Sequence, residues 1–403
     1  MKNIILVLTL LTLLFSIGCY SDGVEKDTTV NNGGDEPVNA TFDKAYSEEA
    51  LDFANKIFRE TFKEDNAVMS PLSLYVALSM ASNGALAETQ EEFGKLLCGE
   101  NYDENKLNNY NRAIMENAKK MDSYTIANSL WIKEDKTEKA FRDVLGKVYK
   151  ADVDKLTTEV PINNWVKEKT KGKIPSILNK VNQDDFAVIV NAIYYYGTWM
   201  EPFKEKNTRP RDFHLENGTD VKTDFMWSGD RGFTVFGYKD GLVLRLNCKD
   251  KTCMYFYLPP EGMKLKDYAK EIDFKEITNM KPMGGKWEIF VPKFKIESSY
   301  DLIPYLENMG LKRCFNLPTS NLSRLSKDPR GVYFSKVIQK ATIDVEEKGV
   351  EATAATAIVA LAGSAAVPPK INYLYLDRPF AYVIYNNSND TVVFTGTVYD
   401  PTK

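Results

Sequence analysis

Residues 344–367, near the C-terminal end of the chain, constrain its fold more than any other stretch. They read DVEEKGVEATAATAIVALAGSAAV, and no proline lies between Glu347 and Ala366. Small side chains recur at every second position, while Glu351 falls on the other face. This period of two predicts a strand whose buried face is unusually small. Pro368 and Pro369 then stop strand pairing. The small face is formed by Val350, Ala352, Ala354, Thr356 and Ile358.

An alanine-rich buried helix is the alternative for the same stretch, because alanine is the best helix former. Its composition alone slightly favours that alternative. A membrane span is excluded, since the apolar run is far shorter than the ~20 residues that cross a bilayer. The rest of the chain has to decide between strand and helix.

Four segments resemble motifs of the serpin family and occur in the same order. EEKGVEATAATAIV is similar to the hinge of a serpin reactive-centre loop, and residues 66–90 to the N-terminal helix-and-shutter motif. Residues 191–203, NAIYYYGTWMEPF, resemble the central-strand and breach motif, and residues 376–384, LDRPFAYVI, the C-terminal signature. The similarity extends over about residues 42–403, and the chain is identified as a member of this family.

The resemblance implies an α+β fold, with helices early in the chain and strands later. Three β-sheets, one of them large, central and mixed, are expected with eight or nine helices in a single domain over 42–403. An exposed reactive-centre loop is expected at about 347–370. In inhibitory members this loop is cut by a serine protease, which becomes acylated. The cleaved loop then inserts into the large sheet as an extra central strand, and the trapped protease is distorted.

The inserting strand must carry small residues on its inward face. Val350, Ala352, Ala354 and Thr356 meet this requirement. Glu347, Gly349 as the pivot, and Ala355 complete the predicted hinge. Bulky or charged residues at these positions would be tolerated in a non-inhibitory serpin, so their absence favours inhibition.

The gate that admits this strand is also predicted by the resemblance. Ser70, Ser73 and Asn191 match the shutter beneath the sheet, and Trp199 matches the breach below the hinge. Gln339 stands where the shutter usually has a histidine, which argues against pH-sensitive gating although Gln can still donate and accept hydrogen bonds. Lys293 and Glu347 match a salt bridge at the top of the sheet. Ordinary core packing and helix capping is the simpler interpretation of all these residues; Ser70, just before Pro71, is typical of a helix N-cap.

The position of the bond that the target protease cuts is predicted only within a range of residues. Counting seventeen residues from Glu347 gives Gly363, with Ser364 after the cut, whereas counting back from the two prolines gives Ala365. Every candidate at 359–366, Ala362 included, is small or aliphatic, which favours elastase-like or subtilisin-like serine proteases over trypsin-like, thrombin-like or caspase-like ones. A chymotrypsin-like cut after Leu361 is the main alternative, and cysteine proteases are a further class of target.

Motifs of catalysis and of metal binding are missing. His214 is the only histidine of the 403 residues, and it lies in a polar stretch typical of a strand edge or turn. The sequence has no nucleophile elbow, zinc-protease helix, phosphate-binding loop or Cys/His cluster. We therefore expect a protein that is not an enzyme and has no cofactor or metal.

Charge excludes some partners. The formal charge of −4 is weak, so neither nucleic acid nor an acidic membrane surface is indicated. A heparin-type basic helix requires a cluster of cations, and Lys167, Lys169, Lys171 and Lys173 are interrupted by Glu168. A solvated helix end is the better interpretation of those lysines.

The N-terminus is a targeting segment. Lys2 precedes the apolar residues 4–17, and Gly18-Cys19 ends the segment like a bacterial lipoprotein cleavage site. Residues 1–19 are thus predicted as a signal peptide with lipid attached to Cys19; an ordinary signal peptide with an incidental cysteine is the alternative. Residues 20–41 are polar and aperiodic, typical of a flexible tether. The protein is expected to be exported, held on the bacterial envelope by its lipid alone or released outside the cell.

The other four cysteines leave one question open. Cys248 and Cys253 flank a four-residue loop between two strand-like runs, so they could form a disulfide across a hairpin or remain free. Cys98 and Cys314 occur in unrelated contexts and are expected to be free thiols.

Two functions remain from the sequence. The first is a monomeric inhibitor of serine proteases that acts as a suicide substrate. The second is a non-inhibitory serpin that serves as a binding module. An unrelated hydrolase on the same fold is opposed by the missing histidines.

Overall fold

The computed structural model describes residues 42–121, 123–133, 136–229, 232–350 and 370–403. Residues Ala40–Lys403 form one compact unit. The predicted signal peptide, the tether, and the greater part of the predicted reactive-centre loop, 351–369, lie outside the described residues. Eight α-helices and sixteen strands are present in the described ranges.

The largest sheet is mixed and has the strand order β11-β12-β4-β2-β3, with β13 paired to β12 at one end. Strands β12 and β4 run parallel, as do β2 and β3, whereas β11 is antiparallel to β12 and β2 is antiparallel to β4. The bounds are β2 Tyr124–Ile132, β3 Asp152–Lys155, β4 Ala187–Tyr195, β11 Phe294–Asp301, β12 Phe334–Glu346 and β13 Gly349–Val350.

Two further sheets complete the β-structure. One is a six-stranded antiparallel sheet in the order β1-β16-β15-β9-β8-β7, and the other has the order β14-β10-β6-β5. Their bounds are β1 Ala67–Met69, β5 Arg209–His214, β6 Asp220–Ser228, β7 Phe233–Tyr238, β8 Gly241–Asn247, β9 Thr252–Leu258, β10 Lys286–Pro292, β14 Ile371–Tyr375, β15 Phe380–Asn386 and β16 Thr391–Val398. The predicted α+β class with three sheets is confirmed.

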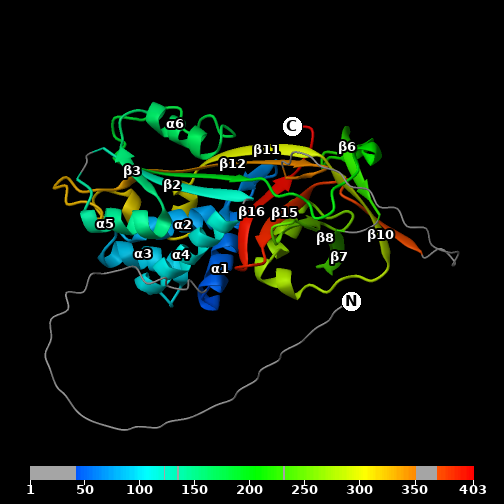
Figure 1. Cartoon of the computed structure of the whole chain (residues 1–403), viewed down its shortest axis with the longest axis horizontal. Coiled ribbons are helices and arrows are strands. Elements are labelled where there is room, and N and C mark those ends of the chain that lie inside the picture. The colour runs from blue at the N-terminus through cyan, green and yellow to red at the C-terminus, as the bar shows by residue number, and fades with distance from the viewer. Residues whose placement is uncertain (1–41, 122, 134–135, 230–231, 351–369) are drawn as a thin grey trace, which may run out of the picture. The chain divides into compact units, whose positions relative to one another are not determined.

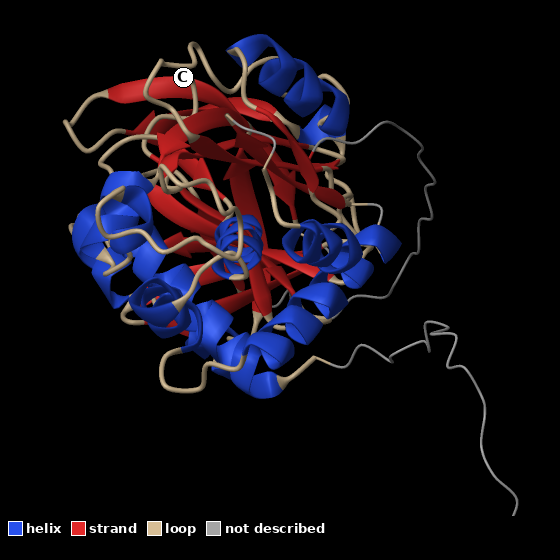
Figure 2. Ribbon diagram, turned by 90° about the vertical axis from the view of Figure 1, so that its left-hand side faces the viewer, coloured by secondary structure: helices blue, strands red, loops and turns tan. Residues whose placement is uncertain are grey.

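Helices cover the largest sheet on both faces (Figures 1 and 2). In Figure 1, α6 lies above the sheet, and α2 to α5 lie below it. The helices are α1 Lys44–Glu60, α2 Pro71–Ser82, α3 Ala87–Cys98, α4 Glu104–Lys120, α5 Lys139–Val144, α6 Glu159–Lys169, α7 Leu265–Tyr268 and α8 Ile303–Asn308.

Strand β4 is the centre of this arrangement, and its sequence AVIVNAIYY explains why. All nine residues are buried, as expected of a strand covered on both faces. Ile189, Ile193 and Tyr195 pack into the main core, whereas Val188 and Val190 pack against the layer that contains α6. Asn191 is the one polar residue in this apolar run, so it needs partners inside the protein.

Helix α2 is apolar all round, which is typical of a helix buried in the core. All twelve of its residues are buried. Its N-terminus begins immediately after β1 and lies beneath the junction of β4 and β12, where Ser73 contacts Asn191. The four N–H groups at the start of a helix have no partner within the helix. This helix end therefore brings polar backbone groups to the centre of the sheet.

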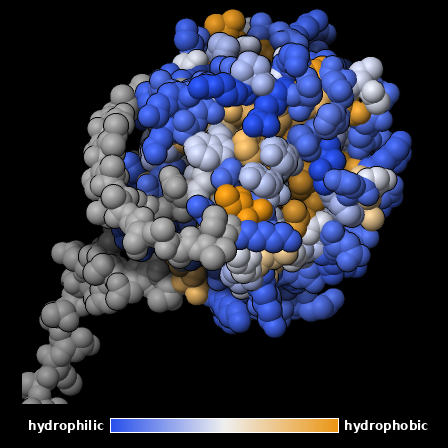
Figure 3. Space-filling model, turned by 90° about the vertical axis from the view of Figure 1, so that its right-hand side faces the viewer, coloured by the Kyte–Doolittle hydropathy of each residue, from blue (hydrophilic) through white to orange (hydrophobic). Residues whose placement is uncertain are grey.

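The surface at one end of the molecule is mainly polar, with small apolar patches (Figure 3). Large apolar side chains that are exposed among the described residues are single residues on different elements. Such scattered residues are normal on a soluble surface. They are Leu86, Val160, Met200, Met263, Met283, Leu317 and Tyr373.

Candidate functional site: the gate between two parallel strands

Strands β12 and β4 are directly paired, and this junction is the centre of the candidate site. Their parallel register runs from Phe334 opposite Ala187 to Thr342 opposite Tyr194. Gln339 on β12 lies opposite Asn191 on β4. A strand inserted into the large sheet at this point must first break that ladder. We call the junction the gate.

Ser70 begins helix α2 at the gate, as its position before Pro71 predicted. Its hydroxyl accepts a hydrogen bond from the Ser73 N–H at 3.1 Å, which caps the helix, and donates to the Val393 carbonyl at 2.6 Å. Ser70 and Ser73 are fully buried. The helix start is thereby fixed to strand β16 as well as to the gate.

Gln339 makes three hydrogen bonds from one buried side chain. Its Oε1 accepts from the Ser70 N–H at 2.8 Å, and its Nε2 donates to the Ser70 carbonyl at 3.0 Å and to Asn191 Oδ1 at 2.6 Å. An imidazole has only two nitrogens, so a histidine could make at most two of these contacts. The amide also carries no titratable proton, so the charge of this position does not change with pH.

Asn191 continues the network toward β2. Its Nδ2 donates to the Ser73 carbonyl at 3.1 Å, to the Ser73 hydroxyl, and to Asn128 Oδ1 at 2.6 Å. Asn128 lies opposite Asn191 in the antiparallel pairing of β2 and β4. A row of three amide side chains, Asn128, Asn191 and Gln339, thus crosses three adjacent strands, and we call it the amide row.

Asn128 was not predicted as a gate residue, although its strand carries a signal. Strand β2 alternates Tyr124, Ile126, Asn128, Leu130 and Ile132, and Asn128 interrupts an otherwise apolar or aromatic face. A buried asparagine needs hydrogen-bond partners. Its Nδ2 has none among the described residues.

Trp199 closes the top of the gate, where the breach was predicted. Its indole N–H donates to the Glu346 carbonyl at 2.9 Å, and its backbone N–H to the Lys348 carbonyl at 3.1 Å. The N–H of Phe203 donates to the Glu347 carbonyl at 2.8 Å. Segment 199–203 therefore holds the backbone that leads from β12 into the hinge.

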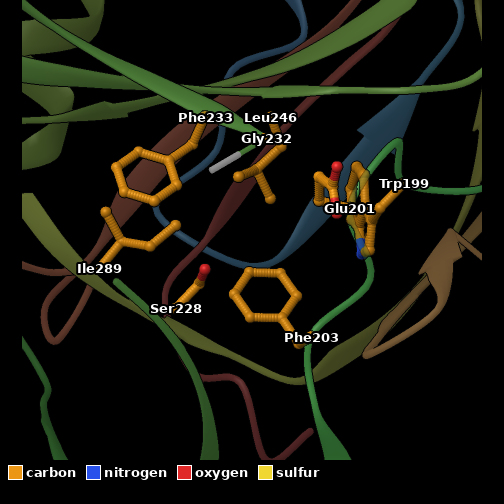
Figure 4. A pocket seen from close by; sticks show the side chains of 8 residues that line it. All are labelled: Trp199, Glu201, Phe203, Ser228, Gly232, Phe233, Leu246 and Ile289. Carbon is orange, nitrogen blue, oxygen red and sulfur yellow. The ribbon is translucent and has the colours of Figure 1, made fainter. Parts of the chain in front are cut away.

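Apolar side chains fill the space beside this segment. Phe203, Phe233, Leu246 and Ile289 point toward one another next to Trp199 (Figure 4). They leave no room inside for a water molecule. The breach is thus a packed contact and not a ligand pocket.

The predicted ion pair between Lys293 and Glu347 is present. Lys293 Nζ lies 2.9 Å from Glu347 Oε2, and the Thr208 hydroxyl donates to Glu347 Oε1 at 2.8 Å. Burial raises the pKa of Glu347, but the hydrogen bonds from Lys293 and Thr208 outweigh it, so the pKa lies below its ordinary value. Burial likewise lowers the pKa of Lys293, and Glu347 more than reverses this, leaving it raised.

Gly349 occupies a position that only glycine fits. Its φ is +153°, and a Cβ would lie 2.2 Å from the Gly197 carbonyl oxygen. The residue bridges to Thr198, and Val350 N–H donates to Gly197 O at 2.7 Å. This close approach places the start of the hinge at the top of the gate.

The remaining predicted site residues lie outside the described part of the chain. They are the hinge residues Ala352, Ala354, Ala355 and Thr356, the reactive-bond candidates Leu361, Ala362, Gly363, Ser364 and Ala365, and the lipidation residue Cys19. The choice between strand and helix for residues 351–367 is therefore untested.

The two hairpin cysteines do not form a disulfide. Asn247, and not Cys248, lies opposite Cys253, so the two thiols point to opposite faces of the sheet. Cys248 packs into the main core, and Cys253 into the core on the other face. Burial raises the pKa of Cys98 and of Cys248 to about 12, which keeps these thiols protonated at neutral pH. The four described cysteines are free and buried.

The histidine and the lysines that the sequence singled out make ordinary structural contacts. His214 ends the edge strand β5, where a hydrogen bond to Asp220 at 2.7 Å raises its pKa. Lys169 pairs with Asp152 at 2.9 Å, and Lys171 lies over the Tyr196 ring at 5.0 Å, so these lysines belong to a helix end and its neighbours. Within the described ranges, no group of His, Cys, Asp and Glu side chains could hold a metal ion. No helix in those ranges is both long and apolar enough to cross a bilayer.

Comparison with known proteins agrees with this geometry. The family model described as "Serpin (serine protease inhibitor)" matches residues 48–401. The chain is 29% identical to plasminogen activator inhibitor 1 of Sus scrofa, over 87% of this chain and 92% of that protein. It is 30% identical to serpin B8 of Homo sapiens, over 87% and 97%.

Solved structures agree as well. Native tengpin, a thermophilic serpin, superimposes with a TM-score of 0.82 at 29% identity, covering 89% of this chain and 95% of tengpin. Thyroxine-binding globulin in complex with thyroxine superimposes with a TM-score of 0.76 at 24% identity, covering 89% and 99%; at that identity the likeness concerns the fold alone.

The chain belongs to the serpin family. Serpins target serine proteases in general, and they are generally secreted or extracellular. The sequence-based expectation of a protein that is simply not an enzyme is corrected by this match, because the matching family model is described by an activity toward proteases, serine protease inhibition.

Proposed function

We propose that this protein inhibits serine endopeptidases as a suicide substrate and traps the acylated protease by inserting its cleaved loop into the large sheet. The direct parallel pairing of β12 with β4, with the hinge at its top, is the observation that carries the proposal. Both strands run toward the hinge, so a loop that folds back between them is antiparallel to each.

Hydrogen bonding supplies the driving force. Insertion exchanges one parallel ladder for two antiparallel ladders, and antiparallel pairing is slightly more stable per residue. The starting fold is then held by a barrier and is not the most stable arrangement of the chain. Two described interactions form this barrier. They are the ion pair between Lys293 and Glu347 and the hydrogen bond between Gln339 and Asn191.

Small and aliphatic residues at 359–366 define the proposed target class. No Arg, Lys or Asp is available in that stretch, so an elastase-like or subtilisin-like protease with a shallow pocket fits best. We propose the bond between Gly363 and Ser364 as the reactive bond, with Leu361, Ala362 and Ala365 as alternatives, and cysteine proteases as a further class of target.

Export and anchoring form part of the proposal. The signal segment 1–19, lipid on Cys19 and the polar tether 20–41 would hold a single monomeric domain, 42–403, on the bacterial envelope or release it outside the cell. Contact with the membrane is then through the lipid alone, and nucleic acid is not a partner.

One gel experiment tests the proposal. Mature protein mixed with pancreatic elastase should form, within minutes, an adduct that survives boiling in detergent, whereas trypsin and thrombin should give little or none. An adduct with thrombin but none with elastase contradicts the target class. Cleavage of the loop by every protease without any adduct contradicts inhibition and leaves the binding module as the function.

A further inference from the structure

The two strands of the gate are also joined at the end that lies away from the hinge. Their register shifts between Phe334 and Lys336, which leaves Ser335 as an extra residue of β12. The Ser335 hydroxyl accepts a hydrogen bond from the Phe186 N–H at 3.1 Å and donates to the Ala187 carbonyl at 3.1 Å. A side chain thus replaces main-chain pairing at the point where β12 and β4 begin.

A buried ion pair reinforces this junction. Lys336 Nζ contacts Asp185 Oδ1, and the two side chains are 16% and 6% exposed. The other carboxylate oxygen, Asp185 Oδ2, accepts a hydrogen bond from the Asn182 N–H at 2.7 Å, so the carboxylate is held from both sides. Water screens so buried a pair only weakly, and separating its charges is therefore costly. We call the contacts of residues 334–336 with residues 185–187 the lower clamp.

Three charged side chains recur at every fourth position of β12 and therefore share one face of the strand. Lys340 pairs with Glu297 at 2.8 Å, and Asp344 pairs with Lys295 at 3.4 Å; both partners lie on β11. The third, Lys336, instead pairs across the gate, with the segment that leads into β4. If β11 and β12 move away from β4 as one unit, the two pairs to β11 stay intact and the pair of Lys336 breaks.

We propose that the lower clamp is a second latch of the gate, which has to open before the inserting loop can fill the gate to its far end. Lys336 lies three residues farther from the hinge than Gln339. A strand that enters at the hinge therefore separates Gln339 from Asn191 before it reaches the clamp. Opening then has two stages: the contacts at the hinge end control entry, and the lower clamp controls completion. The inference rests on the proposed function and adds a restraint to it.

The loop is long enough for the lower clamp to matter. Val350 pairs with Val345 at the hinge end, and Lys336 lies nine residues before Val345 on β12. The proposed reactive bond follows Gly363, which lies thirteen residues after Val350. Residues of paired strands advance by ~3.3 Å each, so in the proposed inserted form a loop cut there reaches the clamp. Complete insertion therefore requires the pair of Lys336 to separate, whereas entry of the first residues does not.

Two matched lysine variants test the latch. Lys336→Met and Lys340→Met each remove an ammonium group from the same face of β12, where the side chains are 16% and 13% exposed. The first breaks a contact across the gate, and the second breaks a contact between β11 and β12. The readout is amide hydrogen exchange of residues 186–190 and 334–338 in the intact protein at neutral pH. Exchange should be about tenfold faster than in the wild type for Lys336→Met and unchanged for Lys340→Met.

Equal exchange in the two variants overturns the latch. So does an increase in Lys336→Met that extends equally to β15 and β16, because it would show global and not local destabilisation. A second variant combines Lys336→Met with Asp185→Asn and so leaves no unpaired charge in the clamp. Its exchange should stay faster than that of the wild type at the same residues; a return to the wild-type rate also overturns the inference.

Nicking the loop separates this failure from that of the proposed function. A wild-type protein that gains no stability on nicking contradicts the proposed function, whatever the exchange rates of the intact protein are. Where the wild type does gain stability, the rise in melting temperature should be about 2–4 °C larger for Lys336→Met, because the pair is already broken in the nicked form. For Lys340→Met it should match the wild type. A rise that is unchanged in Lys336→Met overturns the latch.

Discussion

Glu347 and Lys293 form an ion pair of 2.9 Å that ties the first residue of the predicted reactive-centre loop to the connection between β10 and β11. The Glu347 side chain is 10% exposed and that of Lys293 is 33% exposed, so solvent screens the pair only in part. Beside it, segment 199–203 holds the backbone of residues 346–348. The pair therefore restrains the chain at the point where insertion has to begin.

Breaking this pair should destabilise the closed gate in a pH-dependent way. Because the pKa of Glu347 is lowered in the folded state, its contribution is present above the unfolded pKa and is lost as pH falls below about 4.5. The raised pKa of Lys293 adds a contribution that is lost only above about 10.5. Glu347→Gln should thus cost about 1 kcal/mol of unfolding free energy at pH 7 and almost nothing at pH 3, measured by urea denaturation.

Glu346→Gln is the control, since it removes the adjacent, exposed carboxylate. A cost for Glu347→Gln that is unchanged between pH 7 and pH 3 would show that the ion pair is not its source.

Replacing Gln339 should weaken the gate more strongly. Gln339→Leu keeps the volume but leaves the Ser70 N–H and carbonyl and Asn191 Oδ1 without their partner. Buried polar groups left without hydrogen bonds cost about 1–3 kcal/mol each, so a loss of more than 2 kcal/mol is expected. Urea denaturation at pH 7 measures it. Thr342→Val, on the outer face of the same strand, should change stability by less than about 0.5 kcal/mol; similar values for the two variants contradict a structural role for the amide.

Much of this architecture could be predicted from the sequence, for identifiable reasons. The capping serine occurs in a local pattern, a serine before a proline at the start of a buried helix. Gly349 and the ion pair, whose two residues lie 54 positions apart, were predicted from the family resemblance. Asn128 depends on a long-range register: it acquires a role only because β2 pairs with β4 so that it faces Asn191. A single buried asparagine in an apolar strand does not reveal that partner.

The cysteine pair illustrates the same limit. A four-residue loop between Cys248 and Cys253 permits a disulfide by distance along the chain. The observed register is offset by one residue, which turns the two thiols to opposite faces of the sheet. Since side chains alternate along a strand, a shift of a single residue decides between a bridge and none.

A charged residue on the inward face of the loop should convert the inhibitor into a substrate. Ala354→Arg places a guanidinium on the inward face of the proposed inserted strand, where an unpaired buried charge costs several kcal/mol. Loop insertion should then be slower than deacylation of the protease. The yield of the elastase adduct should fall at least tenfold, while the loop is still cleaved. Glu351→Gln, on the outward face, should keep the adduct; equal yields from wild type and Ala354→Arg would rule out insertion.

Anchoring should depend on one cysteine. Cys19→Ala removes the thiol that the predicted lipid modifies, so the protein should move from the membrane fraction to soluble or unprocessed fractions. Metabolic labelling with a fatty acid, followed by fractionation, measures this. Deletion of residues 1–40 should leave adduct formation intact, because the tether has no core-forming residues; a folded but inactive truncation contradicts the tether.

Nicking the loop should stabilise the protein, which is the reverse of the usual effect of proteolysis. In the proposed inserted form, the loop after Val350 becomes a strand between β12 and β4, and each of its two sides pairs with a neighbouring strand. Roughly ten new backbone hydrogen bonds, each worth ~1 kcal/mol net, add to burial of the small side chains and offset the entropy of ordering the loop. Cleavage at 359–366 should therefore raise the melting temperature by on the order of tens of degrees. The two fragments should stay associated, because β14, β15 and β16 remain paired in their sheets. Differential scanning calorimetry of intact and nicked protein measures the change. A nicked form that melts at or below the intact temperature contradicts stored folding energy, and with it the inhibitory mechanism.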